Sequence, residues 1–302
     1  MSTDPPGDTT RIRGALLGRR RGTGPYRAIR RALAVGCLIA VAGVPAQSPV
    51  AGASTPTTVR VLQMNLCNSG RAGCYTGRAL TRAAEVIRAE RPAVVTLNEI
   101  CRDDVPTLEA AFRATHRGAA VVSAFQAAGD RPSGADTRCR NGQAYGIGLL
   151  TRLPAADSRY AVHSGIHPAQ DVADPEERPW LCVHVDGALN ACTTHLAATS
   201  RAVALTQCGH LLDVILPAIA RSTGYAPTVL SGDLNLRLDD DPDVRSCTPP
   251  GYLRVGDGAV QHIVTSTDIL LCCTRSVGMG GATDHPALLA TLVIDDTRPT
   301  RR

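Results

Sequence analysis

Short apolar runs alternate along the chain with longer stretches in which apolar residues recur every three or four positions. Runs of strand length, rich in Val, Ile, Leu and Ala, occur at residues 59–66, 93–100, 119–125, 144–151, 226–235, 266–272 and 286–294. Residues 180–196 read as two strands joined at Asp186-Gly187. Helical spacing marks residues 78–90, 104–115 and 199–220. Strands interspersed with helices predict an α/β fold.

No repeat, low-complexity tract or linker interrupts this alternation, although residues 129–142 form a loop rich in Gly and Arg. Residues 54–302 therefore predict one domain of roughly 250 residues, a size that α/β folds allow. Aromatic residues make up only 3% of the chain. Aliphatic side chains are therefore expected to fill the core.

The first 53 residues have the features of an export leader. They carry eight Arg against two Asp, a net charge of +6, so the rest of the chain carries −1 of the total of +5. An apolar run at 32–44 has the length of a signal-peptide core and is too short to span a membrane. Small residues follow at Ala46 and Ala53. We expect a secreted protein without a membrane span in its mature form; the alternative is an uncleaved N-terminal anchor.

The cysteines support export. Of eleven Cys, Cys37 lies in the leader and ten remain, none with the spacing of a zinc site. An even number of cysteines outside the leader predicts disulfides formed in an oxidising compartment. The expected pairs are Cys67–Cys74, Cys101–Cys139, Cys182–Cys192 and Cys208–Cys247. No partner can be assigned to Cys272 or Cys273.

Polar residues able to bind a metal or phosphate lie at or near the ends of several predicted strands. They are Asn65, Glu99, His195, Asp233, Asn235, Asp268, Asp284 and His285. Each has an ordinary interpretation in isolation: an Asx turn at 233–235, a capped loop at 284–286, a helix start at Glu99 or a satisfied core histidine at His195. Because buried strands do not tolerate unpaired carboxylates, several of them at strand ends suggest one shared cleft.

The motifs around these residues resemble the endonuclease/exonuclease/phosphatase superfamily, which has a deoxyribonuclease I-like fold. In chain order, and over about residues 59–294, they are QMNLC, TLNEIC, YGIGLLTR, CTTHL, SGDLN, STDILL and ATDHPALLATL. The resemblance implies a four-layer α/β sandwich, in which two mixed β-sheets pack face to face with helices outside. It also implies hydrolysis of a phosphate ester with a divalent cation.

The resemblance further implies a role for each residue. Asn65, Glu99 and Asp284 would hold the cation, which is expected to be Mg²⁺ or Mn²⁺, with Ca²⁺ as a further candidate. His285 would act as the general base, oriented by Asp268. The remaining three contact water or substrate: Asp233 positions the water, Asn235 holds a phosphate oxygen and His195 donates to the phosphate or the leaving oxygen.

The expected function is that of a secreted, monomeric phosphodiesterase that cleaves nucleic acid. One alternative is a hydrolase of phospholipid, sphingomyelin or inositol phosphate on the same fold. A second is a secreted binding protein without turnover. Two departures from nucleases of the deoxyribonuclease I type bear on substrate: Cys101 stands between the metal glutamate and Arg102, and the strand at 144–151 has no Glu to support His195.

Overall fold

The computed structural model describes residues 57–294, so the predicted leader at 1–53 lies outside the described residues. Six strands form the first sheet. Their order is β14 (Ile269–Val277), β15 (Ala287–Ile294), β1 (Thr57–Asn65), β2 (Val94–Cys101), β6 (Tyr145–Arg152) and β3 (Val121–Ala127).

The second sheet also has six strands. Their order is β12 (Tyr252–Gly256), β13 (Gln261–Ser266), β11 (Thr228–Asp233), β10 (Leu189–His195), β9 (Pro179–Val185) and β7 (Tyr160–Ile166). A small third sheet pairs β5 (Ala135–Asp136), β4 (Gly129–Asp130) and β8 (Glu176–Glu177). Both large sheets mix parallel and antiparallel pairs.

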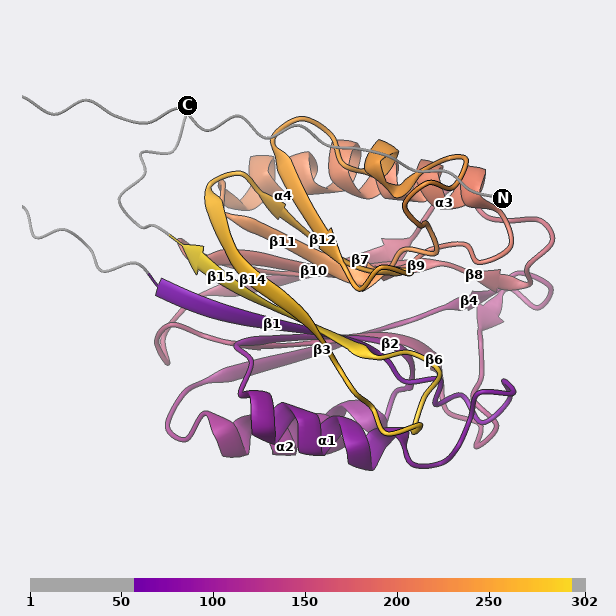
Figure 1. The fold of residues 1–302 in the computed structure, drawn as a ribbon, viewed down its shortest axis with the longest axis horizontal. Helices are drawn as coiled ribbons and strands as arrows, with labels where there is room; N and C mark the ends of the chain where they lie inside the picture. Colours follow the sequence, from indigo (N-terminus) through magenta and orange to yellow (C-terminus); the bar gives the residue numbers. More distant parts are fainter. Residues whose placement is uncertain (1–56, 295–302) are drawn as a thin grey trace, which may run out of the picture. The chain divides into compact units, whose positions relative to one another are not determined.

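Helices cover the outer face of each large sheet. The first sheet carries α1 (Ala79–Glu90) and α2 (Asp104–Thr115), and the second carries one continuous helical run: α3 (Arg201–Gly209), the π-helical η1 (His210–Ile215) and α4 (Leu216–Thr223). A short 3₁₀ turn, η2, covers Val244–Cys247. Figure 1 shows the four layers, which confirms the predicted sandwich.

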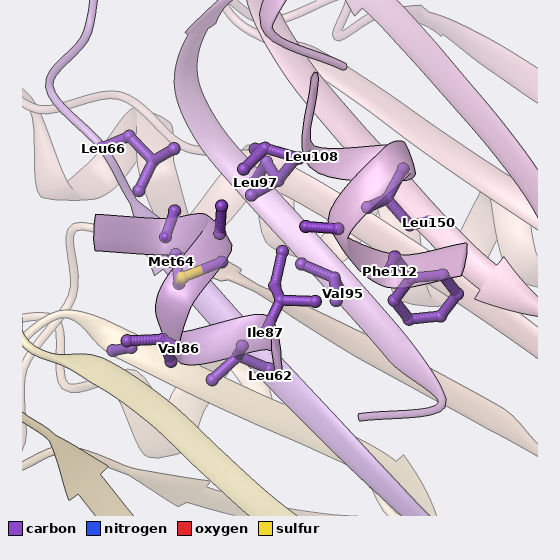
Figure 2. Close-up of a cluster of buried hydrophobic side chains, with 14 of the residues drawn as sticks. Leu62, Met64, Leu66, Val86, Ile87, Val95, Leu97, Leu108, Phe112 and Leu150 are labelled. Atoms are coloured by element: carbon purple, nitrogen blue, oxygen red, sulfur yellow. The ribbon is translucent and has the colours of Figure 1, made fainter. Parts of the chain in front are cut away.

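Three apolar clusters hold these layers together. The largest lies between α1, α2 and the first sheet, where Phe112 and Ile87 pack against strand residues such as Leu97 (Figure 2). A second cluster fills the space between the two sheets and includes Leu149 and Leu292. The third lies under the α3–α4 run. All three are mainly aliphatic, as the scarcity of aromatic residues predicted.

The run Arg201–Thr223 is long and apolar enough to cross a membrane by length and composition alone. Its apolar face is already occupied, since Ala204, Leu211 and Leu216 are buried against the second sheet. The helix therefore serves as a core helix of the sandwich.

All four predicted disulfides form in the structure. They are Cys67–Cys74, Cys101–Cys139, Cys182–Cys192 and Cys208–Cys247. Cys67–Cys74 and Cys101–Cys139 hold the loops that leave β1 and β2. The other two lie in the cluster under the α3–α4 run. Cys272 and Cys273 are free and exposed.

Several predicted elements need correction. Residues 266–272 are not one strand, because a turn at 267–268 separates β13 from β14. The loop at 129–142 contains β4 and β5. The sequence also gave no clear signal for β7 and β12. Both strands are half exposed, so they lack the apolar run that marks a buried strand.

Candidate active site

The site lies at one edge of the sandwich, where strand direction brings eight elements together. In the first sheet β1 and β2 are parallel, and in the second β10 and β11 are parallel, so their carboxyl ends share an edge. The neighbours β6, β15, β9 and β13 are antiparallel to them and begin at that edge. Residues that end the first four strands therefore meet residues that begin the other four.

Glu99 reaches the site through an irregularity in β2. The register with β6 shifts between Leu97 and Ile100, so the strand bulges at this point. Glu99 has φ 56°, a left-handed conformation that a residue with a long side chain rarely adopts. Such strain persists where the surroundings impose it, often at functional sites. The bulge turns the Glu99 carboxylate toward the end of β1.

Asn65 joins two carboxylates. Its Nδ2 donates to Glu99 Oε1 at 2.7 Å and to Asp233 Oδ2 at 3.1 Å. Its Oδ1 accepts from the Cys67 N–H at 3.1 Å, which fixes the orientation of the amide. The first sheet and the second sheet are thus linked at the floor of the site.

Asp233 is almost fully buried and receives further donors. Gln261 Nε2 donates to its Oδ2 at 3.0 Å, and the Asn235 N–H donates to its Oδ1 at 3.1 Å. Burial raises the pKa of Asp233, opposed by the nearby His285 and by the hydrogen bond from Asn65. Burial likewise raises the pKa of Glu99, and the charges of Asp233 and Asp284 raise it further.

His285 lies beside two acids of this region, Asp233 and Asp284. Its Nε2 is 3.8 Å from Asp233 Oδ2 and 3.7 Å from Asp284 Oδ2. Asp284 is half exposed, whereas His285 is only a quarter exposed. Thr283 anchors the segment by donating to the Asn65 carbonyl at 3.1 Å. The imidazole therefore faces the carboxylates from the solvent side of the site.

A buried polar layer supports the site from below. Gln63 Nε2 donates to Asn98 Oδ1 at 2.6 Å and to Gln261 Oε1 at 2.9 Å. Asn98 Oδ1 accepts from the Asp233 N–H at 2.8 Å. Thr96 bonds to Gln63 and to Ser231 across the sheets. Because buried polar groups are costly when unpaired, this network fixes the two sheets against each other where the site needs it.

Arg178 holds His195. This arginine directly precedes β9 and is 4% exposed, and its Nη1 is 3.1 Å from His195 Nδ1. A guanidinium can only donate, so Nδ1 must accept and the neutral imidazole carries its proton on Nε2. Burial, the Arg178 charge and His285 all lower the pKa of His195 well below its ordinary value. His195 is therefore a neutral donor.

Two carboxylates in turn hold Arg178. Asp174 Oδ2 accepts from Nη2 at 2.6 Å, and Glu176 Oε1 lies 3.1 Å from Nη1. Burial raises the pKa of Glu176 to about 7, against the opposing charge of Arg178. The Arg178 Nε is buried with no partner within the described residues. The Arg178 guanidinium therefore lies beside the site with one N–H donor, at Nε, that no described residue accepts.

Asp268 does not orient His285. It lies in the turn after β13, where it accepts from Tyr225 Oη at 2.7 Å and from Ser266 Oγ at 2.5 Å. Gln261, the first residue of β13, pairs with Asp233. Asp268 is seven residues farther along, roughly 20 Å away in an extended strand. The prediction was wrong because β13 runs antiparallel to β11.

In the SGDLN motif, Gly232 and Asn235 have different backbone roles. A Cβ on Gly232 would lie 2.1 Å from the Thr194 carbonyl oxygen, so the glycine permits close approach of β10. The left-handed position is Asn235, with φ 49°. Its Nδ2 donates to the Leu196 carbonyl at 2.8 Å, which places the amide beside His195.

Sequence reasoning missed Arg178, Gln261 and Tyr145. All three stand at or directly before the first residue of an antiparallel strand, whereas Asn65, Glu99, His195 and Asp233 stand at or near the carboxyl ends of parallel strands. The available signal was a polar side chain opening an apolar strand, as in Arg178-Pro179-Trp180 and Gln261-His262-Ile263. Tyr145 is buried, and burial together with Glu176 and Glu99 raises its pKa well above the ordinary value.

The donor set fits a hard divalent cation. Glu99 and Asp284 present carboxylate oxygens, the ligands that Mg²⁺ prefers. Asn65 turns its NH₂ toward the acids, so ligation by its oxygen requires the amide to turn over. Mutual repulsion among Glu99, Asp233 and Asp284 is the kind of strain that a bound cation relieves. Cys67 and Cys74 lie near Asp284 but are joined in a disulfide and supply no thiolate.

The four-layer fold and this cluster of acids, amides and imidazoles define a divalent-metal-dependent phosphoric ester hydrolase. The sequence matches the Endonuclease/Exonuclease/phosphatase family over residues 62–285, and the chain belongs to that family. This match confirms the resemblance inferred from the motifs. No curated protein matches the sequence.

Solved structures show the same fold. A Beutenbergia cavernae endonuclease/exonuclease/phosphatase is 21% identical, with a TM-score of 0.58 over 78% of this chain and 72% of that chain. ANGEL2, a 2′,3′-cyclic phosphatase, is 13% identical, with a TM-score of 0.58 over 80% and 96%. The human Nocturnin catalytic domain with a bound sulfate is 13% identical, with a TM-score of 0.57 over 78% and 93%.

Proposed function

We propose that the protein is a secreted, Mg²⁺-dependent nuclease that hydrolyses phosphodiester bonds at the edge formed by β1, β2, β10 and β11. One observation carries the proposal: Asn65 bonds to both Glu99 and Asp233, and His285 faces Asp233, although these residues are far apart in the chain. An Asx turn or a capped loop does not need partners from another sheet. The contacts between sheets therefore argue against interpreting these residues as an isolated Asx turn, a capped loop or a helix start.

Each side chain has a task in this proposal. Glu99 and Asp284 hold the cation, which supplies charge neutralisation at the phosphate. Asp233 accepts a hydrogen bond from the attacking water, and His285 takes the proton of that water as the general base. Asn235 directs its amide to a phosphate oxygen. His195 donates from Nε2 to the phosphate or to the leaving oxygen.

Arg178 contacts His195 in place of the Glu that the strand at 144–151 lacks. A carboxylate would favour the imidazolium, whereas Arg178 favours the neutral ring with its proton on Nε2. The consequence is a hydrogen-bond donor whose charge does not change over the working pH range. The buried Arg178 charge also opposes the negative charges of Glu99 and Asp233.

Replacing Arg178 with Met should lower kcat and change the pH profile. Without the guanidinium charge the pKa of His195 rises toward its ordinary value, so an acidic limb should enter the pH dependence of kcat/KM. We expect kcat to fall about 10²-fold. Arg178→Lys, which keeps the charge, should keep the pH profile of the parent without this acidic limb. An unchanged profile in Arg178→Met would show that His195 is not held by Arg178.

A rim of exposed arginines supports nucleic acid as the substrate. Arg71 Nε donates to the Arg138 carbonyl at 2.8 Å, and the Arg140 N–H donates to the Ser69 carbonyl at 2.8 Å. The same loop bonds directly to the site, because the Asn68 N–H donates to the Glu99 carbonyl at 2.8 Å. Within residues 57–294, no ion pair occupies Arg71, Arg138 or Arg140.

Neutralising this rim should weaken binding of a long polyanion without affecting the chemistry. The triple change of Arg71, Arg138 and Arg140 to Gln should raise KM for nucleic acid roughly tenfold and reduce the salt slope by about 2–3. Turnover of a small chromogenic phosphodiester should stay unchanged. The matched control removes the same charge at three exposed arginines far from the site: Arg88, Arg117 and Arg221. Equal effects of the two triples would contradict the rim's role.

Secretion is supported by the four disulfides and by the leader-like segment at 1–53.

The experiment that tests the function uses a panel of plasmid DNA, RNA, sphingomyelin and phosphoinositides, each with and without EDTA. We expect cleavage of DNA or RNA that EDTA abolishes. Cleavage of the lipids alone would replace the nuclease proposal with the lipid alternative, and no turnover of any substrate would favour a binding protein.

A further inference from the structure

The two unpaired cysteines lie together on an exposed strand. Cys272 and Cys273 are both exposed in β14, which is an edge strand and pairs with β15 alone. Every other cysteine in residues 57–294 belongs to a disulfide. Neither thiol has a role in the phosphodiesterase site, which lies among the ends of other strands.

A β-bulge places both thiols on one face. Consecutive side chains of a regular strand point to opposite faces, so adjacent cysteines would ordinarily diverge. Here Leu271 pairs with Leu292 and Cys273 pairs with Thr291, which leaves Cys272 as the extra residue. The Cys272 thiol accordingly lies within hydrogen-bonding reach of Cys273.

A disulfide between the two is disfavoured. Neighbouring Cα atoms across a trans peptide are about 3.8 Å apart, whereas disulfides usually join Cα atoms about 4.4–6.8 Å apart. The bond would therefore be strained and easily reduced. The bulge also hinders edge-to-edge pairing with a second chain, which would otherwise bring in an outside cysteine. The pair thus persists as a dithiol.

We propose that Cys272 and Cys273 form a chelating site for a thiophilic divalent cation of the zinc and cadmium class. With metal–sulfur bonds of about 2.3 Å, two thiolates on a tetrahedral ion lie roughly 3.8 Å apart, which suits adjacent thiols. Binding releases two thiol protons and forms two metal–sulfur bonds. Water or an external thiol completes the coordination. The oxygen ligands at Glu99 and Asp284 prefer harder ions, so the two sites select different metals.

Cadmium is the probe, because thiolate ligation gives a sulfur-to-cadmium absorption band in the ultraviolet. The purified protein, with its two thiols first counted by a thiol reagent, is titrated with Cd²⁺ in excess Mg²⁺. We expect the band to saturate at one cation per chain and to vanish in Cys272→Ser and in Cys273→Ser separately. Ser276→Ala, on the same exposed strand, is the matched control and should keep the band.

Hydrolase activity measured with Mg²⁺ should remain at the parent level in both serine variants. The proposal is overturned if the band survives in the double serine variant, or if the parent has two titratable thiols and shows no band. Absence of titratable thiols would also overturn it, since the pair would then be oxidised. Saturation at one cation per two chains would mean a bridge between chains and not a chelate. None of these outcomes depends on the nuclease proposal.

Discussion

Glu99→Gln is expected to lower kcat/KM by about 10²–10³-fold and to remove the response to Mg²⁺ at concentrations that saturate the parent. The amide has nearly the shape of the carboxylate but carries no charge, so the cation loses its most enclosed ligand. The bulge in β2 that presents Glu99 depends on the backbone and should persist. Activity measured against Mg²⁺ concentration, with circular dichroism as a check of folding, tests this expectation. A variant with the Mg²⁺ dependence of the parent would mean that Glu99 is not a ligand.

The same variant has a pH signature. Burial and neighbouring acids raise the pKa of Glu99 in the folded protein, so ionising it without a cation costs stability as pH rises through that pKa. Cation binding requires the ionised form. The rise in Tm on adding Mg²⁺ should therefore be larger in the parent at alkaline pH than at acidic pH. Glu99→Gln should show little rise at either pH.

His285→Ala should reduce kcat by about 10²–10⁴-fold, the range for loss of a general base. The side chain is a quarter exposed and belongs to none of the apolar clusters, so folding should be unaffected. Its only described carboxylate neighbours within ion-pair distance are Asp233 and Asp284. A double variant with Asp233→Asn tests whether the imidazole and Asp233 act as a unit.

If they do, the double variant should be little worse than the more damaging single variant, because each change removes the same proton transfer. Rate losses that multiply would show that His285 and Asp233 act independently. Substantial residual activity in His285→Ala would show that another group serves as the base.

The sequence predicted much of this architecture because its strongest signals were local. The helices at 78–90 and 104–115 agree with α1 and α2 to within one residue, and the hairpin at Asp186-Gly187 joins β9 to β10. Two of the four disulfides also followed from local reasoning, because Cys67–Cys74 closes a short loop and Cys182–Cys192 ties two adjacent strands. Each of these features depends on residues whose periodicity or pairing does not require knowledge of the rest of the fold.

The site was predicted less completely because strand direction is a property of the whole sheet. The structure brings Asn65, Glu99, His195 and Asp233 to one edge because the parallel strands that carry them end there. Arg178, Gln261 and Tyr145 were missed because they lie at the start of β9, β13 and β6, which run antiparallel to the strands that end at the site. Asp268 was assigned to the site wrongly because it follows the far end of β13. No local pattern in the sequence distinguishes a strand that begins at the site from one that ends there.

The main chemical difference that the structure reveals is that Arg178, and not a glutamate, contacts His195. The strand at 144–151 has no glutamate to support His195, a departure that bears on substrate and not on phosphodiester chemistry. A buried guanidinium, held by Asp174 and Glu176, supplies a different support and makes the imidazole a neutral donor. The departure therefore changes how His195 acts and leaves the acidic cluster intact.

The central claim is that one cation is held where the ends of the two sheets meet, and its location can be measured directly. Anomalous scattering from crystals soaked with Mn²⁺ should place a single strong peak in contact with the carboxylates of Glu99 and Asp284, with Asp233 and His285 beside it. A peak confined to the acidic loop at 239–241, or to any surface away from Glu99, would contradict the account.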